Sequence, residues 1–240
     1  MSTLSFHELT KRYGDVAALD GFTAVAMPGR VTAFVGPNGA GKTTALRILL
    51  GLAEPTTGSA TIDGRRYRDL THPTRVVGAV LDQGFHPNRT ARNHLRIIAR
   101  QAGVAPSQAD ELLHRFGLDG AARRRVGGYS LGMRQRLALA SAVIGEPSVL
   151  ILDEPLNGLD PDGIREMRRY LRSFADRGGT VLLSSHLLSE VEAVADDLIV
   201  ISQGRLAAAG ALADLVADTD LESVFHSITH PTHTEQEAWS

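Results

Sequence analysis

The N-terminal part of the chain alternates between apolar and polar positions over short runs, which is the pattern of β-strands. Alternating apolar positions at 3–9 predict a half-buried strand, and the continuous apolar run at 31–35 predicts a buried one. Segments 59–63 and 76–81 have a similar character and predict further strands. The chain therefore begins with several short strands.

Helical spacing first appears after a glycine-rich turn. Within 42–51, Leu46, Leu49 and Leu50 are spaced to share one face of a helix. From about residue 89 to residue 146 the pattern is helical, and its clearest segments are 90–101, 107–117 and 130–145. This region predicts a helical insert.

After Pro147 the chain returns to alternation of strands and helices. The predicted strands are 149–153, 180–185, 198–202 and 205–210, and the predicted helices are 161–175 and 187–194. Strands that alternate with helices are typical of an α/β fold with a largely parallel sheet.

Length and composition change this picture little. At 240 residues the chain suits one domain with a sizeable core, and we expect it to occupy residues 1–225. The remaining residues, 226–240, are polar and are expected to be poorly ordered. His230 and His233 in this tail raise the alternative of a metal pair, but a solvated tail is the simpler interpretation.

Charge and cysteine content restrict the partners. With 25 basic and 27 acidic residues the net charge is -2, which suggests neither nucleic acid nor an anionic membrane as a partner. The lack of cysteine excludes disulfides and thiolate metal sites and fits a reducing cytoplasm. We expect no signal peptide, and no segment approaches the roughly 18 apolar residues that cross a bilayer. If the protein serves a membrane process, another chain should supply the membrane part.

The loop between the strand at 31–35 and the helix at 42–51 has the spacing of a phosphate-binding P-loop. Its residues are Gly36, Pro37, Asn38, Gly39, Ala40, Gly41, Lys42 and Thr43. Lys42 should reach the outer phosphates of a nucleotide, Thr43 should ligate magnesium, and Thr44 should add a hydroxyl to the inner phosphates. Lysine is a rare choice in this chain, which has only one other, Lys11. The alternative is a glycine-rich turn that binds no nucleotide.

The apolar strand at 149–153 ends in two carboxylates, Asp153 and Glu154. A buried strand would deliver Asp153 to the edge of the sheet, where it could bind magnesium through water. Glu154 is predicted to be the general base that polarises water for attack on the γ-phosphate. The alternative is a solvated strand end. With the glycine-rich loop, this pair predicts ATP and Mg²⁺ as ligands.

Residues 129–136, Tyr-Ser-Leu-Gly-Met-Arg-Gln-Arg, resemble the signature of the ABC ATPases, commonly Leu-Ser-Gly-Gly-Gln followed by Arg-Gln-Arg. Ser130 and Gly132 match the serine and second glycine, which in that family face the γ-phosphate bound to the opposite subunit. A serine at a helix N-terminus also suits anion binding on physical grounds, although an ordinary serine-capped helix is the alternative. Leu131 and Met133 depart from the family pattern.

Other motifs follow in the order of the family. Tyr13 resembles the aromatic residue that stacks on adenine, residues 156–160 resemble the D-loop that communicates across the dimer, and His186 resembles the switch histidine that senses the γ-phosphate. Gln83 is favoured as the Q-loop side chain that reaches magnesium and the attacking water. The alternatives are Asp82 in that role or no direct role for either residue.

The resemblance covers about residues 3–220 and implies the family's architecture and assembly. The fold would be a P-loop NTPase (RecA-like) core with a largely parallel sheet, an N-terminal antiparallel β part and an inserted helical subdomain at about 89–146. ATP would be sandwiched between this chain and a second copy of itself or a homologous ATPase subunit.

Within the family, residues 85–96, 129–136 and 153–164 look like the daunorubicin- and bacitracin-resistance branch of bacterial exporters. This implies export of a drug-like or other small molecule through a separate integral membrane permease, with the chain held in the cytoplasm at the inner face of the membrane. The ATPase of an importer and the soluble ATPase of iron–sulfur cluster assembly are the alternatives.

Overall fold

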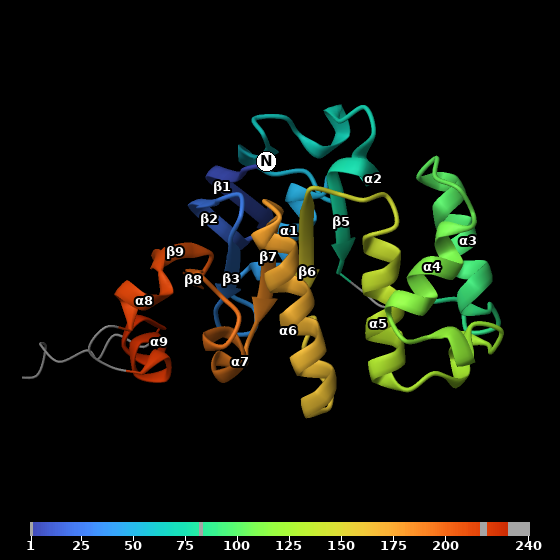
Figure 1. Cartoon of the computed structure of the whole chain (residues 1–240). Coiled ribbons are helices and arrows are strands. Elements are labelled where there is room, and N and C mark those ends of the chain that lie inside the picture. Colours follow the sequence, from blue (N-terminus) through green and yellow to red (C-terminus); the bar gives the residue numbers. More distant parts are fainter. Residues whose placement is uncertain (1, 82–83, 217–219, 230–240) are drawn as a thin grey trace, which may run out of the picture.

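A six-stranded sheet forms the centre of the protein in the computed structural model, which describes residues 2–81, 84–216 and 220–229 (Figure 1). Its strand order is β5-β6-β7-β3-β8-β9; all neighbours are parallel except the antiparallel edge strand β9. The strands are β3 (Val31–Val35), β5 (Val77–Val80), β6 (Val149–Asp153), β7 (Thr180–Ser185), β8 (Asp197–Ser202) and β9 (Arg205–Ala211). Because β3, β7 and β6 are parallel neighbours, the loops that follow them meet at one edge of the sheet.

A second sheet is antiparallel and comes from the N-terminal part of the chain. Its order is β2-β1-β4, with β1 (Leu4–Tyr13), β2 (Val16–Ala26) and β4 (Thr57–Ile62). Phe22 joins the two sheets, because its ring centroid lies 5.3 Å from that of Phe6 in β1 and 5.4 Å from that of Phe34 in β3. The predicted α/β class, with a mostly parallel sheet and an antiparallel N-terminal part, is confirmed.

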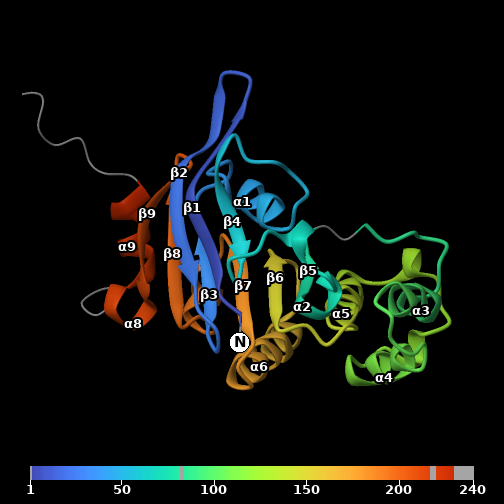
Figure 2. The same cartoon turned by 90° about the horizontal axis from the view of Figure 1, so that it is seen from above.

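Helices α1 (Lys42–Leu49) and α6 (Pro161–Asp176) cover opposite faces of the six-stranded sheet (Figure 2). Successive side chains of β3 point to opposite faces of the sheet. Phe34 belongs to the core beneath α1, and Val35 belongs to the core that includes α6. Helix α1 ends before Gly51, whose φ of 67° no longer fits an α-helix. Short helices α2 (Pro73–Val76), α7 (Leu188–Glu192) and α8 (Leu212–Leu215) lie between strands or follow β9.

Three further helices stand beside the sheet, next to α6 and β5 (Figures 1 and 2). They are α3 (Ala91–Gln101), α4 (Gln108–Arg115) and α5 (Leu131–Ala142), and all lie within the predicted insert. Thr90 and Ser130 cap α3 and α5, since each hydroxyl accepts a hydrogen bond from the backbone N–H three residues later. Leu95, Leu113 and Leu137 are buried where the three helices pack together.

The last helix, α9 (Leu221–Thr229), crosses the expected domain boundary at residue 226. Its first backbone N–H, at Leu221, donates to the carboxylate of Glu192 at the end of α7. The rest of the predicted tail, including His230 and His233, lies outside the described residues. Among the helices that the structure describes, none is long and apolar enough to cross a membrane.

Candidate functional site

Two glycines of the loop between β3 and α1 are packed so closely that neither position has room for a side chain. A Cβ on Gly36 would lie 2.3 Å from the carbonyl oxygen of Ile201, and one on Gly41 would lie 2.5 Å from that of Ala18. Gly39 and Gly41 also have φ values of 81° and 109°, which residues with side chains rarely adopt. The loop therefore presents backbone N–H groups at the N-terminus of α1, an arrangement that binds anions.

Lys42 begins α1 and is only 8% exposed. Its Nζ donates to the carbonyl oxygens of Gly36 and Pro37, at 2.6 and 3.2 Å. Burial lowers the pKa of Lys42, and the negative charges of Glu154 and Asp153 oppose this effect. Within the described residues this ammonium makes no ion pair, so a buried cation is held over the loop by carbonyl groups alone. Such a group is suited to a multiply charged anion.

The carboxylate of Asp153 is held between two hydroxyls. Thr43, in the first turn of α1, donates from Oγ1 to Asp153 Oδ2 at 2.9 Å. Ser184 donates to the other carboxylate oxygen, because the register of β6 and β7 places Asp153 directly beside Ser184. The structure thus brings the two predicted magnesium ligands Thr43 and Asp153 into contact. Ser184 was not predicted, although its position at the end of the strand at 180–185 was the available signal.

Glu154 follows β6 with a φ of 50°, a left-handed conformation that is strained for a residue with a side chain. Its backbone N–H donates to Ser184 Oγ at 3.0 Å, which helps to hold this turn. His186, just after β7, lies with Nδ1 at 2.8 Å from Glu154 Oε2. An ionised carboxylate can only accept, so Nδ1–H is the donor. The predicted base and the predicted switch histidine are therefore paired at the same edge of the sheet.

A cavity of about 270 Å³ joins the loop to the acidic strand end. Its lining consists of Ala18, Asn38, Gly39, Gly41, Lys42, Thr43, Thr44, Asp153 and Glu154. All of these except Ala18 were predicted site residues. Ala18 enters the site from β2, because its backbone lies against Gly41.

Tyr13 lies outside this lining, at the end of β1, and is 54% exposed. Tyr13 pairs with Val16 across the turn of the β1–β2 hairpin. Val16 precedes Ala18, which lines the cavity, by two residues on the same strand. The ammonium of Lys11 lies 4.8 Å from the centroid of the Tyr13 ring, a cation–π contact that holds the ring at the surface. The hairpin therefore presents an exposed aromatic face near the cavity.

Ser130 and Gly132 do not line the cavity either, and they begin α5 in the helical insert (Figure 1). Gly132 lies against the predicted D-loop, because a Cβ on Gly132 would lie 3.6 Å from Leu159 Cδ2. A Cβ on Gly158 would lie 2.1 Å from Leu131 Cδ2, so the leucine that departs from the family signature rests directly on this glycine. Gln135, which was not predicted as a site residue, is buried and donates to the carbonyl of Asn157 at 3.5 Å.

Asp82 and Gln83, the two candidates for the Q-loop position, lie outside the described residues. Elsewhere in the described chain, no three His, Cys, Asp or Glu side chains gather as a metal site. The hydroxyl of Thr43 and the carboxylate of Asp153 fit magnesium, which is usually held by one or two carboxylates together with waters and substrate phosphates.

A glycine-built anion cradle at a helix N-terminus, a buried lysine and an acidic strand end beside a hydroxyl define a P-loop nucleoside triphosphatase. The family model described as ABC transporter matches residues 19–157, more than half of the chain. The chain therefore belongs to the ABC transporter family, and it is an ATP-binding ATPase of that family. The sequence-based prediction is confirmed.

Similar proteins agree with this assignment. The chain is 43% identical over 203 residues to the bacitracin transport ATP-binding protein BcrA of Bacillus licheniformis, covering 83% of this chain and 66% of that protein. It is 40% identical over 206 residues to the lantibiotic transport ATP-binding protein SrtF of Streptococcus pyogenes, covering 85% and 88%. These relatives confirm the predicted resemblance to the bacitracin-resistance branch.

A solved structure of an ATP-binding subunit of an ABC transporter has the same fold. It superposes with a TM-score of 0.85 at 28% identity, covering 94% of this chain and 98% of that one. The likeness therefore includes the insert as well as the two sheets.

Proposed function

We propose that the chain hydrolyses ATP at an interface between two ATPase subunits and thereby drives export of a small molecule through a separate membrane permease. The observation that carries this proposal is the convergence of three groups at one edge of the sheet. They are the phosphate loop with Lys42, the Thr43–Asp153 contact and the Glu154–His186 pair. Each supplies a different requirement of phosphoryl transfer to water.

Binding uses the groups around the loop. The backbone N–H groups of residues 38–41 and the hydroxyl of Thr44 contact the inner phosphates, and Lys42 exchanges its loop carbonyls for the outer phosphates. Thr43 and Asp153 would hold Mg²⁺, which neutralises charge on the phosphates during transfer. Tyr13 stacks on the adenine from the hairpin.

Hydrolysis uses the paired carboxylate and imidazole. Glu154 accepts a proton from water while the water oxygen bonds to the γ-phosphorus and the bond to the leaving ADP oxygen breaks. His186 orients Glu154 through Nδ1–H, and in its imidazolium form it also donates from Nε2–H to the γ-phosphate. Gln83 is proposed to reach the magnesium and the attacking water.

The second subunit supplies the remaining contact. Ser130 caps α5 in the insert, and neither Ser130 nor Gly132 lines the cavity of its own chain. A helix N-terminus with a serine hydroxyl binds anions well, so we assign these two residues to the γ-phosphate held by a second copy or a homologous subunit. One such interface contains two composite sites.

The export assignment rests on the segments that resemble the exporter branch and on relatives named for bacitracin and lantibiotic transport. A separate integral membrane permease would bind the substrate, and the chain would act in the cytoplasm at the inner face of the membrane. A neighbouring reading frame for a small polytopic membrane protein would support export. One for a periplasmic binding protein would contradict it.

Nucleotide binding is tested by replacing Lys42 with alanine. Lys42→Ala should abolish tight ATP binding in a fluorescent-nucleotide titration and should abolish phosphate release, because no other buried cation lines the described cavity. Arg47→Ala is the matched control, since Arg47 is an exposed cation of the same helix. Retained binding in Lys42→Ala, or equal loss in both variants, would contradict the assignment of the loop.

A further inference from the structure

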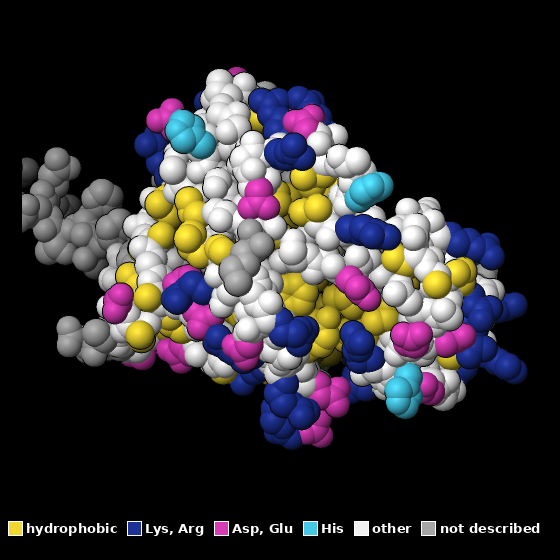
Figure 3. Space-filling view, turned by 45° about the horizontal axis from the view of Figure 1, so that its top comes forward, with side chains coloured by type: hydrophobic (Ala, Val, Ile, Leu, Met, Phe, Trp, Pro, Cys, Tyr) yellow, Lys and Arg dark blue, Asp and Glu magenta, His cyan; other side chains and the backbone are white. Residues whose placement is uncertain are grey.

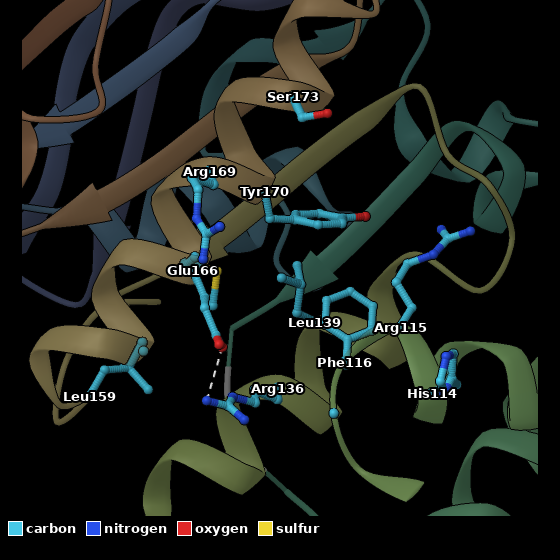
Figure 4. A pocket seen from close by; sticks show the side chains of 13 residues that line it. His114, Arg115, Phe116, Arg136, Leu139, Leu159, Glu166, Arg169, Tyr170 and Ser173 are labelled. Carbon is cyan, nitrogen blue, oxygen red and sulfur yellow. Dashed lines mark ion pairs between the residues drawn. The ribbon is translucent and has the colours of Figure 1, made fainter.

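A second cavity lies between the helical insert and α6, away from the phosphate loop (Figure 4). Its volume is about 520 Å³, compared with about 270 Å³ at the phosphate loop. Small-molecule sites commonly measure roughly 300–1,000 Å³ and combine an apolar lining with a few polar groups. The walls come from the end of α4, from α5 and from α6, so the cavity touches both the insert and the core.

The apolar part of the cavity is built around two aromatic rings. The centroids of Phe116, at the end of α4, and Tyr170, on α6, lie 5.3 Å apart. Leu139 of α5 and Met167 of α6 add aliphatic surface. Figure 3 shows a hollowed strip of hydrophobic side chains between α6 and the insert, bordered by basic and acidic ones. An aromatic or aliphatic group would lose water-exposed apolar surface by entering here.

The charged part of the cavity is predominantly basic. Arg136 of α5 pairs with Glu166 of α6 at 2.9 Å, and Glu166 is the one carboxylate among the described lining residues. Arg115 and Arg169 also line the cavity, and within the described chain neither makes an ion pair or a side-chain hydrogen bond. In Figure 4 the hydroxyl end of Tyr170 points toward the Arg115 side. Two unpaired guanidinium groups around an apolar pocket are complementary to an anion with an apolar body.

We propose that this cavity is a regulatory site for a small amphipathic anion, a molecule with an aromatic or aliphatic body and a carboxylate, sulfonate or phosphate group. The occupant bridges α5, which is capped by Ser130, and α6, which begins directly after the D-loop. It therefore restrains the insert relative to the core and lowers ATP turnover. The effect on turnover rests on the proposed function, whereas binding itself does not.

The binding test uses anilinonaphthalene sulfonate, a fluorescent aromatic anion, with the full chain and without nucleotide. We expect saturable binding with one probe per chain, weakened roughly tenfold or more by Arg115→Glu and by Arg169→Glu, since each removes a charge-assisted contact. Arg65→Glu, the same change at an exposed arginine outside the cavity, should bind normally. Equal binding by all four proteins, or binding that does not saturate, would overturn the site.

Two further measurements separate the parts of the proposal. Phenylnaphthylamine, which keeps the aromatic body but has no sulfonate, should bind more weakly than the sulfonate; equal affinity would overturn the requirement for an anion. Saturating sulfonate should lower the ATPase rate of the unmodified chain and of Arg65→Glu but not of Arg169→Glu. Confirmed binding with an unchanged rate would overturn regulation, and Lys42→Ala tests the ATPase assignment independently.

Discussion

Ser184 contacts both acidic residues of the site, although its side chain has no charge. Its hydroxyl donates to Asp153 and accepts from the backbone N–H of Glu154 at 3.0 Å. One side chain therefore fixes the proposed magnesium ligand and the turn that presents the proposed base. Groups that orient a metal ligand commonly change metal affinity or activity by about 10- to 100-fold when they are removed.

We predict that Ser184→Ala raises the magnesium concentration needed for half-maximal ATPase activity by roughly tenfold or more, because Asp153 loses one of its two hydroxyl contacts. Phosphate release measured against magnesium concentration tests this. Ser184→Thr keeps the hydroxyl and should restore most of the activity. If the magnesium requirement of Ser184→Ala is unchanged, Ser184 does not position Asp153.

Replacement of Tyr13 by alanine should weaken ATP binding by about 1 to 3 kcal/mol, the range for stacking of an aromatic side chain on a base. Because the Tyr13 ring is exposed, its removal should change the free energy of unfolding little. Tyr13→Phe retains the stacking face and should bind nearly normally. A nucleotide titration in which all three proteins have the same Kd would leave Tyr13 without a role at the base.

Residue spacing was sufficient to predict the part of the site that is local in sequence. Lys42 and Thr43 follow the glycines of one loop, and Asp153 and Glu154 end one strand. The contact of Ser184 with Asp153 depends on β6 and β7 being neighbours. Strand order comes from the packing of the whole sheet and has no local pattern, which explains why this residue was missed.

The helical insert and the D-loop form a common surface. Leu131 rests on Gly158, and Gln135 donates to the carbonyl of Asn157. The serine cap of α5 could be predicted from the sequence because a serine precedes a helical pattern. The packing of Leu131 on Gly158 could not be predicted from the sequence, because it depends on how the insert packs against the loop after β6. Leu131, which departs from the family signature, thus has a specific contact in the fold, with Gly158.

We predict that Ser130→Arg abolishes ATPase turnover while ATP binding to the single chain stays nearly normal, because Ser130 does not line its own cavity. A mixture of Ser130→Arg with Lys42→Ala should be more active than either variant alone. In the mixed dimer, the intact loop of one chain faces the intact Ser130 of the other. The ATPase rate of the mixture, compared with each variant at the same total concentration, measures this.

The absence of recovery in that mixture would have two explanations, which crosslinking separates. If the mixed dimer forms with ATP but remains inactive, the two sites must act together. If no mixed dimer is captured across the interface, Ser130 does not complete a site on another chain.

In the proposed mechanism, one copy of the chain holds only part of the reaction site. The phosphate loop and the Glu154–His186 pair lie at the edge of the six-stranded sheet, whereas Ser130 begins a helix of the insert beside it (Figure 1). This separation follows from the topology, because α5 leads into β6, next to the edge strand β5, whereas the phosphate loop follows β3 in the middle of the sheet. ATP bound at the interface would therefore stabilise a dimer of two chains, and its hydrolysis would allow the chains to dissociate.

Removing the proposed base while keeping its shape should trap the joined state. Glu154→Gln retains the size and hydrogen-bonding capacity of the side chain but cannot take a proton from water, so hydrolysis should slow by about 100-fold or more. Bound ATP should then hold two chains together, and size-exclusion chromatography with ATP should show a dimer that the unmodified protein forms only transiently. High protein concentration and low salt favour detection of a weak dimer.

Glu154→Gln combined with Lys42→Ala is the control and should stay monomeric because it does not bind ATP. A Glu154→Gln protein that binds ATP and elutes as a monomer under all these conditions would contradict the sandwich mechanism and leave a P-loop ATPase that works as a single chain.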